Sequence, residues 1–143
     1  MVYQPGELKV LAYKNGVKWV EDSVKTTCEA NKLELLADRT VIQADGKDLS
    51  FITVRVADIN GLIVPRTHNA LKFSIEGPGE IIATDNGDAA SLISFASTER
   101  EAFNGLCLVI VRGKPRLQGI IKLKVESLGL EPATIVIKSL NKK

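Results

Sequence analysis

Long apolar runs, aromatic residues and cysteines are all scarce in this sequence of 143 residues. No stretch approaches the ~20 consecutive apolar residues of a membrane-spanning helix, and the N-terminus lacks the basic, hydrophobic and small-residue order of a secretory signal. Net charge is also small, because 19 basic residues stand against 17 acidic ones and leave a formal charge of +2. These absences argue against a membrane or a nucleic acid as partner.

The two cysteines form no metal or redox motif. Cys28 and Cys107 stand far apart, outside any CxxC or Cys/His spacing of the kind that binds zinc or supports thiol redox chemistry. Cys107 lies within an apolar segment, which predicts a small buried hydrophobic side chain. A disulfide between the two cysteines, and with it their redox state, stays open at this point.

Strand-like segments separated by turn signals make up most of the sequence, and the clearest runs from Ala44 to Pro65. Every second residue from Ile52 to Val56 is apolar, as in a strand with one face on a core. Asn60-Gly61 accepts the positive φ angles of a chain reversal, and Pro65 has no backbone N–H to donate to a ladder. We therefore expect a hairpin whose second strand spans Leu62 to Val64.

Turn signals and apolar residues predict further short strands along the rest of the chain. The unbroken apolar run from Leu106 to Val111 predicts a central strand covered on both faces. Between residues 89 and 104 we expect at best a short strand around Leu92 to Phe95 and a single helical turn at Thr98 to Glu101. A kink at Ala37 to Thr40 interrupts the first strand where it crosses between two sheets. The other strands are expected at residues 33–35, 41–42, 71–76, 80–84, 119–127 and 133–138.

The N-terminal segment predicts a separate hairpin. Asn15-Gly16 lies between two strand-like runs, Glu7 to Tyr13 and Lys18 to Thr27. An isolated hairpin is marginal in water, so it requires the rest of the chain or a missing neighbour to lie against. We therefore divide the chain into residues 1–29, a hairpin and linker for which the end of a preceding domain is one interpretation, and residues 30–143, the main body.

Seven or more short strands with almost no helical period predict an all-β fold. The expected architecture is an immunoglobulin-like β-sandwich of about seven strands with an extra N-terminal β-hairpin. The Cys–Trp–Cys pattern of antibody domains is missing, because Trp19 is the sole tryptophan and falls in the hairpin. The likeness is therefore one of architecture.

Few residues qualify as a metal or catalytic site. Asp85, Asn86 and Asp88 are the only metal candidates, since oxygens at alternate positions suit Ca²⁺. In a glycine-containing loop such side chains more often bind their own backbone, and we expect that arrangement and no metal. His68 is the lone histidine and has no nucleophile or second ligand at a recognisable spacing, which predicts a solvated loop residue.

Aromatic residues near the N-terminus leave two interpretations. Tyr3, Tyr13 and Trp19 fall in the first segment. Flat rings stack on sugars, so Tyr13 and Trp19 are candidates for carbohydrate binding. An apolar body with one polar donor also suits a contact with the sandwich or with a preceding domain, and we favour this second interpretation.

Four runs of residues resemble a known family in order and spacing. They are ADGKDLSFITVRVADINGLIVP, LKFSIEGPGEIIATDNGD, REAFNGLCLVIVRG and IIKLKVESLGLEPATIVI. Together they resemble the C-terminal immunoglobulin-like domain of bacterial family 2 glycoside hydrolases, chiefly β-galactosidases. GELKVLAYKNGVKW resembles the closing hairpin of the domain before it. Because the ADGKD turn is shared with invasin-type modules, an adhesin repeat is a competing interpretation.

This resemblance implies an accessory role and no catalysis by this chain. Hydrolysis in the family belongs to a TIM barrel with two glutamates, which needs about 250 residues, so no catalytic residue and no cofactor is carried over to this chain. Retaining hydrolysis requires two carboxyl groups about 5 Å apart in a cleft, and only Asp85 with Asp88 comes near that pattern. We expect the preceding domains of a periplasmic or secreted parent enzyme as partners. A carbohydrate-binding module is the alternative, ahead of an adhesin repeat.

Overall fold

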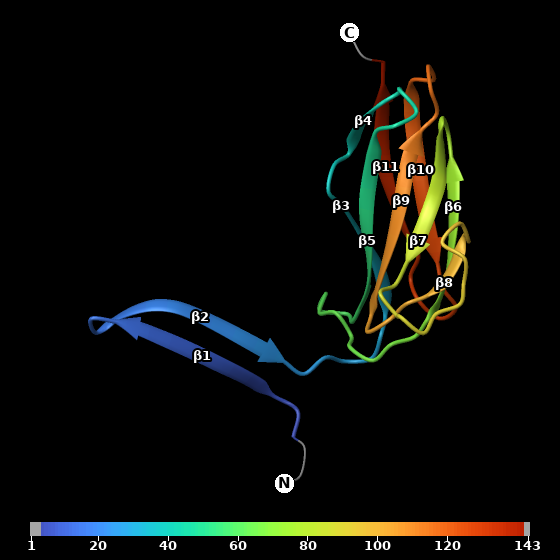
Figure 1. Cartoon of the computed structure of the whole chain (residues 1–143). Coiled ribbons are helices and arrows are strands. Elements are labelled where there is room, and N and C mark those ends of the chain that lie inside the picture. Colours follow the sequence, from blue (N-terminus) through green and yellow to red (C-terminus); the bar gives the residue numbers. More distant parts are fainter. Residues whose placement is uncertain (1–3, 142–143) are drawn as a thin grey trace.

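The computed structural model describes residues 4–141, which form eleven strands and no helix (Figure 1). No membrane-spanning helix is therefore found among them. The strands are β1 (Glu7–Lys14), β2 (Val17–Lys25), β3 (Lys32–Ala37), β4 (Val41–Gln43), β5 (Leu49–Ala57), β6 (Ala70–Glu76), β7 (Gly79–Asp85), β8 (Glu99–Glu101), β9 (Leu106–Gly113), β10 (Gly119–Glu126) and β11 (Ala133–Leu140).

Two stacked sheets make up the main body. One has the order β4-β11-β10-β6-β8 and the other β3-β5-β9-β7, while β1 and β2 form a two-stranded sheet of their own. The all-β, immunoglobulin-like expectation is confirmed. The two sheets hold five and four strands, more than about seven, because the three-residue strands β4 and β8 extend the larger sheet at both edges.

The first strand of the body crosses between the sheets, as predicted. β3 pairs antiparallel with β5 in one sheet, whereas β4 pairs parallel with β11 in the other. The change of sheet takes place at Asp38–Thr40. Asp38 Oδ1 accepts the Phe51 backbone N–H at 2.8 Å, which holds the corner against the start of β5. The kink therefore joins the two layers at one edge.

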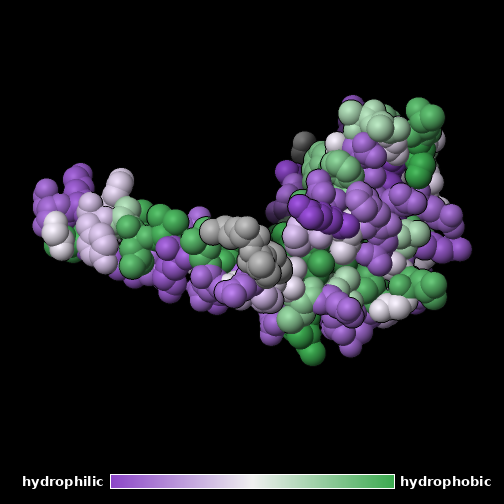
Figure 2. All heavy atoms as spheres, turned by 90° about the horizontal axis from the view of Figure 1, so that it is seen from below, coloured by the Kyte–Doolittle hydropathy of each residue, from purple (hydrophilic) through white to green (hydrophobic). Residues whose placement is uncertain are grey.

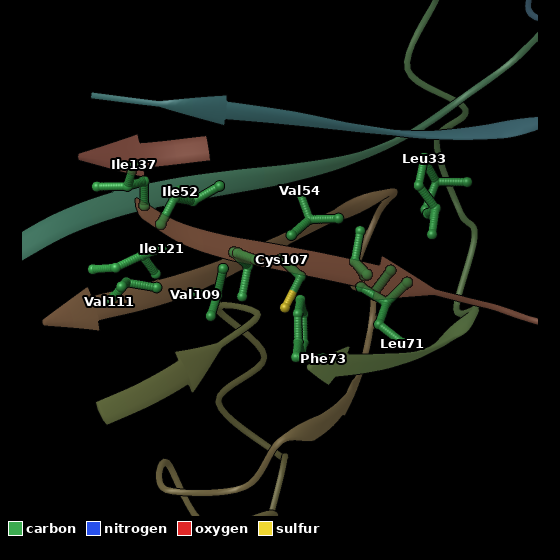
Figure 3. Packing of buried hydrophobic residues seen from close by; sticks show 14 of the residues in the cluster. Leu33, Ile52, Val54, Leu71, Phe73, Cys107, Val109, Val111, Ile121 and Ile137 are labelled. Atoms are coloured by element: carbon green, nitrogen blue, oxygen red, sulfur yellow. The ribbon is translucent and has the colours of Figure 1, made fainter. Parts of the chain in front are cut away.

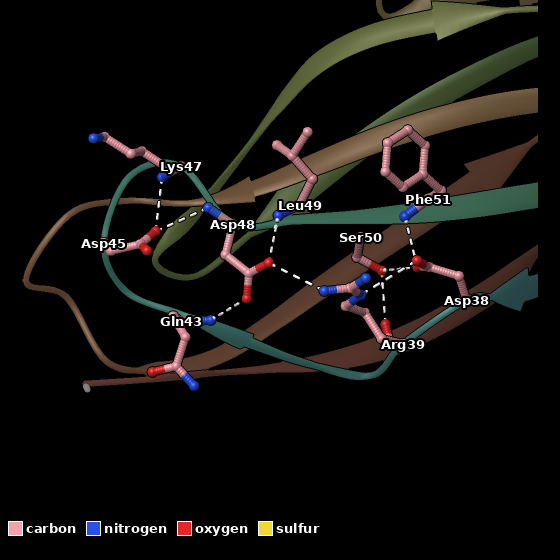
Figure 4. A network of polar contacts seen from close by, with 9 residues as sticks. All are labelled: Asp38, Arg39, Gln43, Asp45, Lys47, Asp48, Leu49, Ser50 and Phe51. Carbon is pink, nitrogen blue, oxygen red and sulfur yellow. Dashed lines mark hydrogen bonds and ion pairs between the residues drawn. The ribbon is translucent and has the colours of Figure 1, made fainter. Parts of the chain in front are cut away.

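Two neighbouring carboxylates shape the turn between β4 and β5 (Figure 4). Asp45 Oδ1 accepts the backbone N–H groups of Lys47 and Asp48, each at 2.8 Å. Asp48 in turn accepts the N–H of Gln43 at 2.8 Å and that of Leu49 at 3.0 Å. These bonds explain the two aspartates of the ADGKD run, because each closes a different part of one turn. The Asp48 and Lys47 N–H groups also lower the pKa of the Asp45 carboxyl.

β5 alternates as expected, but its hairpin is incomplete. Ile52, Val54 and Val56 are fully buried. The expected second strand, Leu62 to Val64, is wrong, because these residues form only an isolated bridge between Ala57 and Ile63. Val64 donates the last ladder bond, to Val56 O at 2.9 Å, and Pro65 has no N–H with which to continue it.

β9 is central but covered on one face only. It lies between β5 and β7, as predicted. Its inward side chains Cys107, Val109 and Val111 are buried, whereas Leu106 on the outer face is 38% exposed. The expectation of cover on both faces is therefore wrong. A run of apolar residues cannot reveal that no second layer lies on the outside of its sheet.

The segment between β7 and β9 also differs from expectation. Leu92 to Phe95 form no strand, and Thr98 to Glu101 do not form a helical turn, because β8 pairs with β6 there. Buried Arg100 determines this arrangement. Its guanidinium donates to Thr84 Oγ1 at 3.0 Å and to the carbonyls of Ile93 and Ser94 at 3.1 and 2.8 Å, so the loop folds around it.

Buried aliphatic side chains from both sheets meet in a single core (Figure 3). Ile52 and Val109 of one sheet face Ile121 and Ile137 of the other, and all four are fully buried. Burying a side chain of this size contributes about 1.5–3 kcal/mol. The inner faces of the two sheets therefore bury each other, and this apolar packing stabilises the sandwich.

Gly77 in the turn between β6 and β7 offers a test of this packing. Its φ is +92°, and a Cβ there would lie 2.1 Å from the Ile120 carbonyl oxygen. We expect Gly77→Ala to lower the free energy of unfolding by about 2–4 kcal/mol, from backbone strain and the clash together. Urea unfolding followed by far-ultraviolet circular dichroism measures the loss.

Gly129→Ala is the matched control. Gly129 has a similar φ of +77°, but nothing lies within 4 Å of a Cβ at this position. In this variant the free energy of unfolding should fall only by the cost of backbone strain, about 1–2 kcal/mol. Equal losses in the two variants would show that the close approach of Gly77 to β10 does not matter.

Candidate functional site

The N-terminal hairpin projects from one end of the sandwich, and its side chains face solvent (Figures 1 and 2). Asn15 and Gly16, at φ angles of 52° and 79°, make the predicted turn. Trp19 is 71% and Leu8 70% exposed. Large apolar side chains on both strands thus lie uncovered, which is unusual for a sheet of a folded domain.

The register divides the hairpin into two different faces. Residues paired across the strands share a face, and successive residues alternate between faces. One face, which we call the apolar hairpin face, bears six apolar side chains and two charged ones, those of Asp22 and, next to the turn, Lys14. The six are Leu8, Val10, Ala12, Val17, Val20 and Val24.

Charged pairs occupy the opposite face. Lys9 Nζ lies 3.6 Å from Glu21, which also pairs with Lys18, and Lys25 Nζ lies 3.8 Å from Glu7. Exposed pairs of this kind stabilise a hairpin little, but they make the face compatible with water. The hairpin is therefore amphipathic, with Leu11 and Tyr13 as the large apolar side chains on the charged face.

The two predicted aromatic candidates lie near the hairpin turn. Tyr13 is 62% exposed, and the Lys14 ammonium lies 5.7 Å from the centre of the Trp19 ring. The exposed rings are accessible to a sugar or to another domain, so the role of Tyr13 and Trp19 stays a prediction. Tyr3 lies outside the described residues.

Asp58 joins the linker to the sandwich. Its buried carboxylate accepts the backbone N–H groups of Cys28, Asn60 and Leu62, each at 2.9 Å. The Cys28 N–H lowers the pKa of Asp58 most, and with the other two it outweighs the opposing effect of burial. Asn31 N also donates to Ala57 O at 2.9 Å. The chain is thus fixed where it leaves the hairpin.

The predicted metal candidates hold their own turn together. Asp85 Oδ1 accepts the N–H groups of Asn86 and Gly87, at 2.8 and 3.2 Å, while Asp88 Oδ1 accepts that of Ala90 at 2.9 Å. The expected binding of these side chains to their own backbone is confirmed. Within residues 4–141, no group of three His, Cys, Asp or Glu side chains is arranged to hold a metal.

The remaining candidates lie apart from one another. His68 is exposed, with its ring centre 5.9 Å from that of Phe103. Cys28 is exposed and Cys107 buried, and both are free thiols. Burial raises the pKa of Cys107 to about 12, which confirms the small buried hydrophobic residue predicted there and leaves its thiol protonated at neutral pH.

Sequence reasoning missed two residues that organise this end of the molecule. Arg100 gave no signal, since nothing marks a charged residue as buried. Asp58 lies two residues before Asn60-Gly61, a pattern typical of a side chain that caps its own turn. The pattern did not reveal that the same carboxylate also binds Cys28, because the two are 30 positions apart.

A protein-family model matches most of the sequence of this chain. The model of the glycoside hydrolase family 2 C-terminal domain 5 covers residues 33–136. The chain belongs to this family. The C-terminal domain 5 match spans strands β3 to β11 of the sandwich and leaves out the hairpin.

Two relatives extend the likeness over the hairpin. A β-galactosidase of Bacteroides ovatus, BoGH2A, is 37% identical over 139 residues, which is 96% of this chain and 16% of the relative. A crystal structure of a family 2 member from Bacteroides cellulosilyticus, 32% identical, matches 100% of this chain with a TM-score of 0.92, and 18% of its own chain is covered. The chain thus spans less than a fifth of either relative.

A C-terminal fragment of intimin has a similar fold. It matches 74% of this chain with a TM-score of 0.52 at 16% identity, and 32% of its own chain is covered. At that identity the likeness shows the fold alone. The adhesin-repeat alternative stays a prediction.

Removing the Asp58 carboxylate tests the joint between linker and sandwich. In Asp58→Ala the Cys28 N–H loses its charged acceptor, so we expect its hydrogen exchange, measured by NMR, to accelerate at least about tenfold. Because the folded-state pKa is lowered, the carboxylate stabilises the joint above about pH 4 and progressively less as the pH falls through that lowered value.

Asp88→Ala serves as the control for this experiment. Its carboxylate also accepts a backbone N–H, but in the loop that follows β7. Exchange at Cys28 should match the parent chain in this variant, and exchange at buried Val109 reports global stability in both. Unchanged Cys28 exchange in Asp58→Ala would show that this bond does not hold the linker.

Proposed function

We propose that this chain is the accessory, non-catalytic C-terminal domain of a β-galactosidase-like family 2 glycoside hydrolase. Its role is structural: it holds the geometry of the domains that precede it. Residues 1–29 belong in this proposal to the preceding domain, which the hairpin closes. The observation that carries the proposal is the apolar hairpin face, which no other part of the described chain covers.

The relatives support this context. The family is by its description a C-terminal domain, and the Bacteroides ovatus relative is a β-galactosidase in which the matched region makes up 16% of the chain. The Bacteroides cellulosilyticus structure matches hairpin and sandwich together. A parent of the same build would supply a neighbour next to the hairpin.

Side-chain chemistry supports a non-catalytic role. Retaining hydrolysis needs a pair of carboxyl groups about 5 Å apart in a cleft, one of them with a raised pKa. Asp85 and Asp88 instead accept backbone N–H groups of their own turn. The aspartates with shifted pKa values, Asp38, Asp45 and Asp58, are all shifted downward, which does not suit a general acid.

Substitutions on the two hairpin faces test the proposal. Val10 lies on the apolar hairpin face and is 61% exposed in this chain. We expect Val10→Asp to change the stability of the chain alone by less than about 0.5 kcal/mol. In the parent enzyme the same change should lower the melting temperature by several degrees, because it buries a carboxylate. Thermal unfolding of chain and parent gives both values.

Leu11→Asp is the matched control, since Leu11 lies on the charged face of the same strand. It should affect chain and parent alike. Assays with a chromogenic β-galactoside accompany the series, with turnover expected from the parent and none from this chain. An equal response of the parent to both variants, or turnover by the chain that depends on one of its own carboxylates, would refute the proposal.

A further inference from the structure

A groove lies in the corner between the hairpin and the sandwich. Its volume is about 710 Å³. The hairpin base contributes Leu8 and Val24, which pair across β1 and β2 on the apolar hairpin face. Ile63 and Pro65, from the loop after β5, line the sandwich side. We call this feature the corner groove.

Hydrogen bonds hold both walls of the corner groove in place. At the hairpin base, Thr26 N donates to Gly6 O at 2.9 Å, and Gly6 N donates to Thr26 Oγ1 at 3.0 Å. On the sandwich side, Asp58 fixes the turn that leads to Ile63 and also binds Cys28 of the linker. One carboxylate therefore sets the position of both the loop and the chain that leaves the hairpin.

The apolar hairpin face runs into this groove without a break. Leu8 and Val24 are 70% and 69% exposed, and they belong to the face and to the groove at once. Glu7 and Lys25 also line the groove, and they pair with each other at 3.8 Å. Whatever covers the hairpin face thus meets Ile63 and Pro65 of the sandwich across a groove whose two charged lining side chains are paired.

The length of the relatives identifies the occupant. The matched region is 16% and 18% of two relatives, and the family is a C-terminal domain, so most of such a protein precedes it. In a parent of the proposed kind, the domain that covers the hairpin would be bound to this chain covalently, which would give it a high effective concentration at the corner. No second copy of the chain has that advantage.

We propose that the corner groove is a second docking surface, in which the rest of the preceding domain of the parent, beyond residues 1–29, contacts Ile63 and Pro65 as well as the hairpin. This inference rests on the proposed function. It adds that the contact extends onto the sandwich itself. The two domains then meet on both sides of the linker, and their angle is set by packing as well as by Asp58.

Hydroxyl-radical footprinting of the parent enzyme and of this chain alone tests the inference. The oxidation rate of a side chain follows its solvent exposure, and mass spectrometry resolves it by residue. We expect Ile63 and Pro65 to be oxidised at least about threefold more slowly in the parent than in the chain. Leu117, 52% exposed at the other end of the sandwich, is the internal control and should not change.

The hairpin supplies a separate readout in the same experiment. Protection of Leu8 and Val10 together with Ile63 and Pro65 supports the inference. Protection of the hairpin side chains alone overturns it and leaves the proposed function intact. Protection of neither set overturns both.

Thermal unfolding of an Ile63→Asp variant gives a second, independent test. We expect this variant to lower the melting temperature of the parent by several degrees more than that of the chain alone, because a buried carboxylate in the groove opposes docking. Leu117→Asp should change both proteins alike. An Ile63→Asp effect that is the same in chain and parent contradicts the inference.

Discussion

A two-stranded sheet cannot cover its own apolar face, and this constraint distinguishes the hairpin from the sandwich. The sandwich meets the same requirement internally, because its two sheets turn Ile52, Val109, Ile121 and Ile137 toward each other. The hairpin has no such second layer. In the proposed function, its apolar face is therefore the part of the chain that a neighbouring domain stabilises.

Carboxylates that accept backbone N–H groups give the loops their fixed shape. Asp45 and Asp48 close the turn between β4 and β5, Asp85 and Asp88 close the loop after β7, and Asp58 binds both its own turn and the linker. These bonds need no metal and leave no carboxylate of this group free for acid catalysis. The same chemistry thus explains why the loops are ordered and why a structural role suits them.

The sequence allowed prediction of the strands and layers, because alternation of apolar residues reports which face of a strand is buried. It also located the kink at Asp38–Thr40 and the turn at Asn15-Gly16. Prediction from the sequence failed where tertiary contacts determine the local structure. Arg100 organises its loop through bonds to Thr84 and to main-chain carbonyls, and Leu106 lacks an outer layer that a single strand cannot reveal.

The site was accessible to sequence reasoning only in part. A hairpin in need of a neighbour could be predicted, and so could turns held by Asp85 and Asp88. The corner groove could not, because it brings Leu8 next to Ile63 from distant parts of the chain. The sugar-binding alternative for Trp19 and the periplasmic or secreted location of the parent stay predictions.

Amide hydrogen exchange in the isolated chain tests the central claim most directly. If nothing within the chain stabilises the hairpin, amides of β1 and β2 should exchange through local opening with a free energy close to zero, while those of β5 and β9 exchange only through global unfolding. Hairpin amides protected as strongly as those of the sandwich core would contradict the claim that the hairpin depends on a neighbour.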